Sequence, residues 1–423
     1  MDCTPMHLVS MREKWLLIAG RTNGMHTFNP TDNFPPQRQN RTAYVIDPRT
    51  GNVKGRELDD TFSGLEEWQI DLLSVTSPQF LQIKNTLYVT GGYGVNSNTN
   101  DFSNKPYLTA IDIPMLMEWI ENRKTCYQAV STMRHLRNSI FQVTGGVMAK
   151  ISHHPILLLV GQNFIGSYTP SSNGIYTQQI RRFDILDDGK KLDVKIYASK
   201  PIGQDPNLRR RDLNIVPILR SNQGELTTEL DILSGVFTVD GGIWTVPVRV
   251  KANGNYKMRN PMNPNTFKQG MNNYACPTFG VFSQETKDMY TLLFGGISYG
   301  YFENGNFLTS ESFPFINQIT AVKLDRNNDY THYILKTTYP EILSTRSNPG
   351  NPLLFGAGAQ LIPTRDFHET TSKSIYVIDE CSSKETLTIG YIVGGIASTL
   401  PDTSQASDSF ASPYIFKVKL KIK

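Results

Sequence analysis

Short apolar runs that end in glycine recur along the whole chain. Each run is too short for a helix core and is rich in Val, Ile, Leu and Tyr, so it predicts a strand buried on both faces. The first glycines of successive runs lie roughly 60 to 100 residues apart, which indicates six repeats. The runs are 15–20, 86–92, 156–161, 230–235, 290–296 and 389–395.

Further predicted strands flank each run. In 80–92 a second apolar segment precedes the run across the short turn KNT. A polar loop follows the glycines, and a third strand then closes on an aspartate, as at Asp47 and Asp112. A fourth strand, such as 194–199, completes the unit. Four-stranded units repeated six times predict an all-β fold, a six-bladed β-propeller.

The glycines also carry a resemblance to a known family. Four hydrophobic residues before a Gly-Gly doublet resemble the kelch repeat of the galactose-oxidase-like propellers. The family's Tyr and Trp after the glycines are largely missing, and the repeats exceed the roughly 50 residues of a kelch unit. The resemblance implies a kelch-like propeller with long loops on one face, but no particular activity. The doublets are Gly91-Gly92, Gly295-Gly296 and Gly394-Gly395, with single Gly20, Gly161 and Gly235 elsewhere.

The repeats predict one domain of 423 residues. An insertion around 374–383 predicts an extended hairpin in the last repeat. The final segment, 413–423, reads as a third strand, and a closed propeller needs a fourth. We therefore hypothesise that the natural protein begins upstream of Met1, with a closing strand and a segment that could include a secretion signal. The approximate blades are 6–76, 77–137, 138–209, 210–270, 271–349 and 350–423.

One helix is predicted at 114–124. Pro114 stands at its start, and Leu116, Trp119 and Ile120 share one face. We expect this face to pack against the outside of the second blade.

Charge and cysteine content exclude several classes of protein. Charged residues make up 19% of the chain, the formal net charge is +4, and no block of like charge occurs, which argues against a nucleic-acid partner. No apolar stretch is long enough for a transmembrane segment. The cysteines Cys3, Cys126, Cys276 and Cys381 are far apart, which excludes a zinc ribbon; buried thiols are favoured, and one long-range disulfide stays open. The composition suits a secreted, cell-surface or periplasmic protein and also fits a cytoplasmic one, and this chain contains no signal peptide.

The loops between second and third strands are the first candidate site. All are long except that of the fourth unit, and loops beyond about 12 residues are usually functional or disordered. They contain Asn, Ser and aromatic residues, among them Tyr93 and Tyr299, which suit adaptable polar contacts and stacking. The alternative is that they are spacers without a ligand. The loops are 21–41, 93–105, 162–174, 297–316 and 396–411.

The second candidate site lies where first strands begin, at the expected mouth of a central channel. Forked hydrogen bonds from Arg, Asn and Tyr could bind a carboxylate or a sugar there. The alternative is that these residues connect neighbouring blades. The ligand-binding candidates are Arg137, Asn138, Arg211, Asp212, Asn273 and Tyr274, with Asn272 beside them and Gln360 as the weakest.

Catalytic and metal candidates are weaker, and we predict no catalytic residue, metal ligand or cofactor. None of the seven histidines matches the two His and two Tyr of the copper oxidases. The pair His153-His154 is expected in a surface turn. His135 adjoins Arg134 and Arg137, but a structural role is favoured over acid–base catalysis. Residues 296–300 fit GxSxG without the helix that a nucleophile elbow needs.

These patterns favour a non-catalytic protein that binds a protein or a glycan through its loop-rich face. The alternative is an enzyme on the same fold, either a cofactor-free sugar isomerase similar to the sialic acid mutarotases or a copper radical oxidase. An isomerase would need Arg, an acid and Asn or His in the channel, so the sequence leaves it open.

Overall fold

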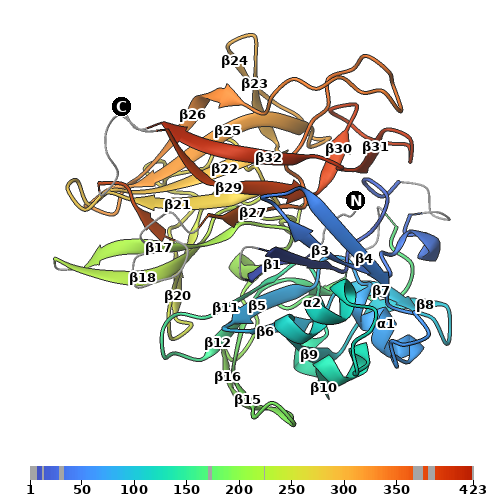
Figure 1. The fold of residues 1–423 in the computed structure, drawn as a ribbon. Helices are drawn as coiled ribbons and strands as arrows, with labels where there is room; N and C mark the ends of the chain where they lie inside the picture. The colour runs from blue at the N-terminus through green and yellow to red at the C-terminus, as the bar shows by residue number, and fades with distance from the viewer. Residues whose placement is uncertain are drawn as a thin grey trace. The chain divides into compact units, whose positions relative to one another are not determined.

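The computed structural model describes residues 7–11, 14–27, 33–169, 174–222, 224–364, 375–379 and 386–421. The chain divides into two compact units. Unit 1 comprises 1–149 and 156–211, and unit 2 comprises 150–155 and 212–423. Within each unit the strands form three large, mainly antiparallel sheets (Figure 1).

Unit 1 contains the first three sheets, each with four strands in meander order. The first consists of β1 (His7–Met11), β2 (Lys14–Ile18), β3 (Thr42–Asp47) and β4 (Asn52–Glu57). The second consists of β5 (Gln79–Ile83), β6 (Thr86–Thr90), β9 (Tyr107–Asp112) and β10 (Met133–Arg137). The third consists of β11 (Val147–Ala149), β12 (Ile156–Leu159), β15 (Ile180–Asp187) and β16 (Leu192–Lys200).

Unit 2 contains the other three sheets. The fourth consists of β17 (Ile215–Asn222), β18 (Glu225–Ile232), β19 (Val248–Lys251) and β20 (Tyr256–Met258). The fifth has β21 (Thr278–Phe282), β22 (Met289–Ile297), β25 (Phe315–Leu324) and β26 (Tyr330–Thr338), and the sixth has β27 (Ala359–Pro363), β29 (Thr386–Gly394) and β32 (Ile415–Lys421). These sheets are the blades of a six-bladed β-propeller, which confirms the predicted fold class. The last strand is the third of its blade, as the sequence predicts.

The insertion in the sixth repeat does not extend a hairpin, so that prediction is wrong for its described part. Strand β28 (Ile375–Val377) instead pairs in parallel with β21 of the fifth blade. Its side chains are fully buried, and the Tyr376 ring stacks on Phe279 with centroids 4.6 Å apart. Asp379 then accepts a hydrogen bond of 2.8 Å from Ser283 Oγ. The apolar segment 375–377 thus pairs with the edge of β21 opposite β22, and its side chains are buried against the fifth blade.

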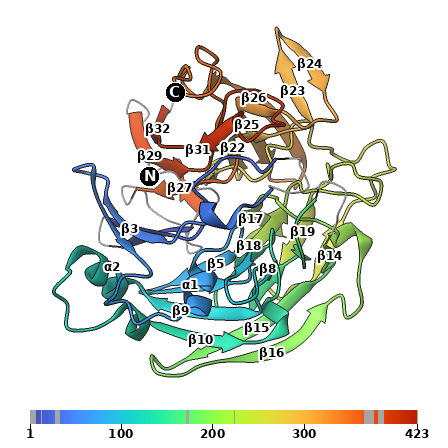
Figure 2. The ribbon, with the colours of Figure 1, turned by 90° about the vertical axis from the view of Figure 1, so that its right-hand side faces the viewer.

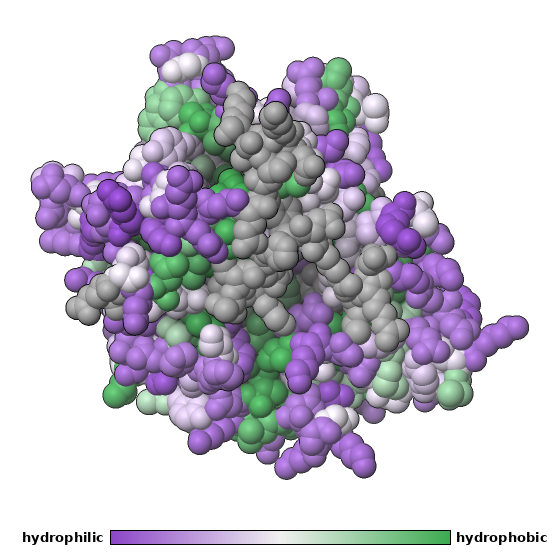
Figure 3. Space-filling model, turned by 60° about the vertical axis from the view of Figure 1, so that its left-hand side comes forward, coloured by the Kyte–Doolittle hydropathy of each residue, from purple (hydrophilic) through white to green (hydrophobic). Residues whose placement is uncertain are grey.

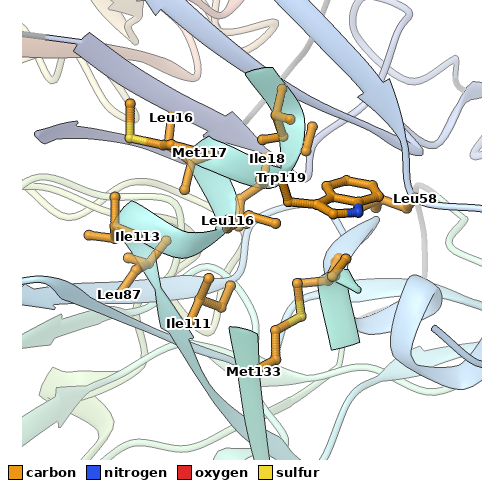
Figure 4. Packing of buried hydrophobic residues seen from close by; sticks show 14 of the residues in the cluster. Leu16, Ile18, Leu58, Leu87, Ile111, Ile113, Leu116, Met117, Trp119 and Met133 are labelled. Atoms are coloured by element: carbon orange, nitrogen blue, oxygen red, sulfur yellow. The ribbon is translucent and has the colours of Figure 1, made fainter. Parts of the chain in front are cut away.

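The predicted helix is present as α2 (Ile113–Glu121), and Asp112 caps it by accepting a hydrogen bond from Met115 N–H. Its predicted packing is wrong, because α2 lies mainly on β3 and β4 of the first blade (Figure 2). There Trp119 and Leu116 fill a core between the first two blades (Figure 4). Sequence periodicity identified the apolar face, but not the surface that would cover it.

A second α-helix, α1 (Glu67–Leu73), was not predicted. It begins with a capping box in which Glu66 and Gln69 exchange side-chain and backbone hydrogen bonds, so the paired acids at 66 and 67 belong to a helix start. Short 3₁₀ turns occupy Pro36–Arg38, Ala129–Thr132, Ser139–Phe141 and Pro206–Leu208. Neither α-helix in the described residues has the length and apolarity needed to cross a bilayer.

Four of the five long loops contain a short β-hairpin beyond the glycines. Backbone hydrogen bonds fix the paired residues of each hairpin relative to one another. The strands are β7 (Tyr93–Asn96) with β8 (Asp101–Asn104), β13 (Gln162–Asn163) with β14 (Ile175–Tyr176), β23 (Gly300–Glu303) with β24 (Asn306–Thr309), and β30 (Ile396–Ser398) with β31 (Ser409–Ala411).

The doublet glycines provide a stability test. Gly91 has a φ of +66°, and an added Cβ would overlap the carbonyl oxygen of Val143 in the next blade. Gly51 has a similar φ of +71° but nothing within 4 Å of such a Cβ. We expect Gly91→Ala to lower the free energy of unfolding by about 2 kcal/mol more than Gly51→Ala, since only Gly91 adds overpacking to backbone strain. Denaturant unfolding of both variants measures the difference, and equal losses would contradict close blade contact at Gly91.

Candidate functional site

In unit 1 the loops of three successive blades are joined to one another. The β7–β8 hairpin of the second blade pairs with the third blade's loop, where Asn104 N–H donates to Phe164 O at 3.0 Å and Gly166 N–H donates to Phe102 O at 2.8 Å. The first blade's loop joins them through Asn33, whose amide donates to Tyr168 O at 2.6 Å. Three loops that are far apart in sequence therefore form one surface.

Six aromatic rings pack together where these loops meet, and we call them the aromatic assembly. Tyr93 lies at its centre, with ring centroids 5.3 Å from Phe34 and 5.6 Å from both Phe102 and Phe164. The Tyr93 hydroxyl donates to Gly166 O at 2.8 Å and accepts from the backbone N–H of Tyr168 at 3.0 Å. Its members are His26, Phe34, Tyr93, Phe102, Phe164 and Tyr168.

Tyr93 was predicted as an aromatic platform in a loop, and it lies buried with 5% of its surface exposed. Burial raises the pKa of its hydroxyl to about 12, so the phenol stays protonated at neutral pH. Its ring is covered by the assembly, and its hydroxyl bridges backbone groups of the third blade's loop. Tyr93 therefore positions the loops, while the half-buried rings of His26, Phe34 and Tyr168 lie further out.

A buried arginine lies against the assembly. Arg21 is 3% exposed, and its guanidinium lies 5.1 Å from the centroid of the Phe34 ring. It donates to Pro35 O at 2.8 Å and to Asn23 Oδ1 at 3.0 Å. No described carboxylate lies within ion-pair distance of it, and burial lowers its pKa to about 10. Arg21 stays charged at neutral pH, and it forms a cation–π contact with the Phe34 ring.

The outer residues of the first and third blades' loops form what we call the hairpin surface: His26, Phe34, Ile165 and Tyr168. The three rings are half-buried, whereas Ile165 is 69% exposed. Ring faces held by neighbouring rings can stack on an apolar ligand face at little entropic cost. The sequence identified the loops but not these residues, because no local signal shows which aromatic side chains of different loops meet. Figure 3 shows one face of the molecule, where hydrophilic residues cover most of the coloured surface and hydrophobic ones gather in small patches.

Arg137 and Asn138 lie away from the predicted position. Arg137 is the last residue of β10, the outermost strand of the second blade, and the first strand of the third blade begins only at Val147. Asn138 caps a 3₁₀ turn by accepting a hydrogen bond from Ile140 N–H at 3.0 Å. Their expected position at the start of a first strand is therefore wrong, because 138–146 form a connection without a strand.

Arg211 and Asp212 do precede a first strand, β17, as predicted. Arg211 is half-buried, and its Nε donates to the Tyr176 hydroxyl at 3.1 Å. A second arginine also contacts Tyr176: the Arg209 guanidinium lies 3.9 Å from the centroid of the Tyr176 ring. The two arginines thus share one buried tyrosine of the third blade.

Asn273 and Tyr274 precede β21, the first strand of the fifth blade, as predicted. Asn273 is fully buried, and its amide donates to Gly295 O at 2.8 Å and Gln318 O at 3.2 Å. Both bonds lie within the fifth blade. The amide of Asn214 in the fourth blade donates to Asn273 O at 2.7 Å, which agrees with the alternative that these residues connect neighbouring blades. Tyr274 is half-buried and bonds Ile297 through its backbone.

Tyr299 is half-buried beside Phe313, with ring centroids 6.1 Å apart. It lies in unit 2 with Asp212, Asn273 and Tyr274, while Tyr93, Arg137, Asn138 and Arg211 lie in unit 1. Of the four in unit 1, Tyr93 alone belongs to the aromatic assembly.

His135 was expected at the channel mouth, but it lies on the outermost strand β10. Its Nδ1 is 3.0 Å from Thr109 Oγ1 and its Nε2 is 3.2 Å from Gln69 Nε2. Burial lowers its pKa to about 4, so the ring is neutral at neutral pH. These contacts support the structural role that the sequence favoured.

Three further features that the sequence raised concern the GxSxG match, metal binding and the cysteines. Ser298 of the GxSxG match is fully buried, donates to Gly300 O at 2.6 Å, and is followed by strands β23 and β24. The described residues contain no group of three or more His, Cys, Asp or Glu side chains that could hold a metal ion. Cys276 is buried and unpaired, whereas Cys126 is exposed and unpaired; Cys3 and Cys381 lie outside the described residues.

No family model and no curated protein matches this chain. Among solved structures it is similar to one described as the structure of YjhT, with a TM-score of 0.47 and 11% sequence identity. The similarity covers 99% of this chain and 96% of that chain.

Proposed function

We propose that this protein is a non-catalytic binding protein whose ligand, a glycan or a protein, contacts the hairpin surface of unit 1. The observation that carries the proposal is the convergence of three loops on one aromatic assembly. Loops that served only as spacers would not need mutual hydrogen bonds and a shared core of six rings. The half-buried rings and the exposed Ile165 offer stacking and apolar contacts, and the Arg21 guanidinium forms a cation–π contact with the Phe34 ring.

The kelch-type assignment, a secreted or periplasmic location, and ligand contacts by Arg137, Asn138, Arg211, Asp212, Asn273, Tyr274 and Tyr299 stay predictions from the sequence. The proposal needs none of them. It depends on the aromatic assembly, on the hairpin surface and on Arg21.

A binding experiment tests the proposal. The purified chain is screened on a glycan array and against a displayed peptide library, and the affinity of each hit is measured for variants. We expect Ile165→Asp to weaken binding by at least about 30-fold, the effect of losing one central contact of roughly 2 kcal/mol. Tyr168→Ala is the second variant, because it removes a ring without adding charge.

The matched control is Leu186→Asp. Leu186 is also an exposed apolar residue of the third blade, 54% exposed, but it lies near the other end of β15 from the loop-facing end at Ile180. It should leave affinity unchanged. If both Ile165→Asp and Tyr168→Ala bind as the unmodified chain does, or if Leu186→Asp is equally defective, the hairpin surface is not the binding site.

A further inference from the structure

The sixth blade differs from the other five at its outer side. Among the described residues the other blades have a fourth strand outside the third, whereas the sixth ends at β32, which pairs only with β29 (Figure 1). The third strands β3 and β9 are largely buried. Strand β32 has the same place in its blade, yet none of its residues is buried. It therefore has the exposure of an edge strand at a position that is internal elsewhere.

The two faces of β32 have different chemistry. Phe416, Val418 and Leu420 are partly buried and pack on the core of the fifth and sixth blades. Lys417, Lys419 and Lys421 alternate with them and are exposed. None of these three lysines forms an ion pair with a carboxylate in the part of the chain that the structure describes. The strand therefore combines an unpaired backbone edge with a row of uncompensated positive charge on one face.

The sequence led us to expect a closing strand of this chain at this edge; from the exposed lysines we propose instead that the outer edge of β32 binds an extended acidic strand of a separate polypeptide. Backbone N–H and C=O groups of an exposed edge bind an added strand by β-augmentation, and the side chains set its specificity. In an antiparallel pair, side chains opposite each other on one face have Cβ atoms about 4.5–5.5 Å apart, so carboxylates at alternate positions would face the three lysines. Apolar residues at the other positions would extend the core face of Phe416 and Val418.

A second copy of this chain fits the edge less well. Pairing of β32 with another β32 would place lysines of both copies on one face, and like charges opposite each other destabilise a strand pair. Charge complementarity thus favours an acidic occupant over self-association.

The test uses the full chain and a synthetic fluorescent peptide in which Glu alternates with Val. We expect saturable binding by fluorescence anisotropy and slower amide hydrogen exchange in 415–421. Lys417→Glu combined with Lys419→Glu should weaken binding by about tenfold or more, since two favourable cross-strand pairs become unfavourable. The control is Lys54→Glu combined with Lys336→Glu, which changes the net charge equally on the outermost strands of other blades.

A second peptide separates strand pairing from simple charge attraction. It has the same sequence with every backbone amide N-methylated, so it keeps its carboxylates but loses the backbone donors of both strand edges. Binding should be lost with this peptide. The proposal is overturned if the N-methylated peptide binds equally, if neither peptide binds, if the control variant is equally defective, or if light scattering shows a dimer that Lys419→Glu disrupts.

Discussion

Replacement of Asp187 by alanine should lower the free energy of unfolding by about 3 kcal/mol, because it leaves the partly buried Arg134 without its counter-ion. Asp187 ends β15 of the third blade and accepts two hydrogen bonds from Arg134 on β10 of the second blade, at 2.8 and 2.7 Å. It also accepts hydrogen bonds from the Tyr88 hydroxyl at 2.9 Å and Gly189 N–H at 3.0 Å. The side chains of Asp187 and Arg134 are only 6% and 14% exposed, so water cannot replace these contacts.

The same pair predicts a pH dependence. Burial raises the pKa of Asp187, but the hydrogen bonds from Arg134, Gly189 and Tyr88 outweigh it and hold this pKa below its ordinary value. The stabilisation is therefore complete above the unfolded-state pKa of about 3.9 and is lost as pH falls through the lower folded-state pKa. Unfolding free energies of the unmodified chain and of Asp187→Asn should thus differ most at neutral pH and converge in acid.

Asp329→Ala is the control for Asp187→Ala. Asp329 pairs with Arg259 at 3.4 Å, but their side chains are 66% and 50% exposed, so its loss should cost at most about 1 kcal/mol. Denaturant titrations at neutral pH measure both variants. Equal losses would show that the Arg134–Asp187 pair does not stabilise the contact between the second and third blades.

Trp119→Ala should have a comparable effect, lowering the free energy of unfolding by about 3–5 kcal/mol through the cavity that it leaves. Trp119 is completely buried in α2 (Figure 4). The Arg56 guanidinium lies 4.1 Å from the centroid of its ring. Its indole N–H also donates to Phe62 O at 3.3 Å. The substitution removes a large apolar side chain and leaves the Arg56 cation, itself 3% exposed, beside an empty space.

Phe62→Ala is the matched control, since Phe62 is a neighbouring aromatic residue with 38% of its surface exposed. Its backbone carbonyl still accepts the bond from Trp119. We expect a loss of less than about 1 kcal/mol, as for most surface substitutions. A Trp119→Ala variant no less stable than Phe62→Ala would mean that α2 contributes little to the core of the first two blades.

The sequence by itself was enough to predict the repeats, the strands and the helix at 114–124. These features depend on local alternation of polar and apolar residues, which the chain carries within each short segment. It also predicted that 413–423 forms a third strand and that long loops follow the second strands; that these loops hold a binding site stays a prediction. Both follow from strand order within a repeat, which glycines and turns mark along the chain.

Contacts between segments distant in sequence were decided only by the tertiary structure. Apolar residues such as Trp119 and Tyr376 must be buried, but the pattern does not state which blade covers them, so the packing of α2 and the pairing of β28 were predicted wrongly. The position of Arg137 was also predicted wrongly. Arg137 ends the outermost strand β10, and no strand begins in 138–146. The aromatic assembly joins three blades through rings whose proximity depends on the fold, so no single loop could reveal it. Local sequence determines what each segment can form, and burial against distant segments determines where its side chains act.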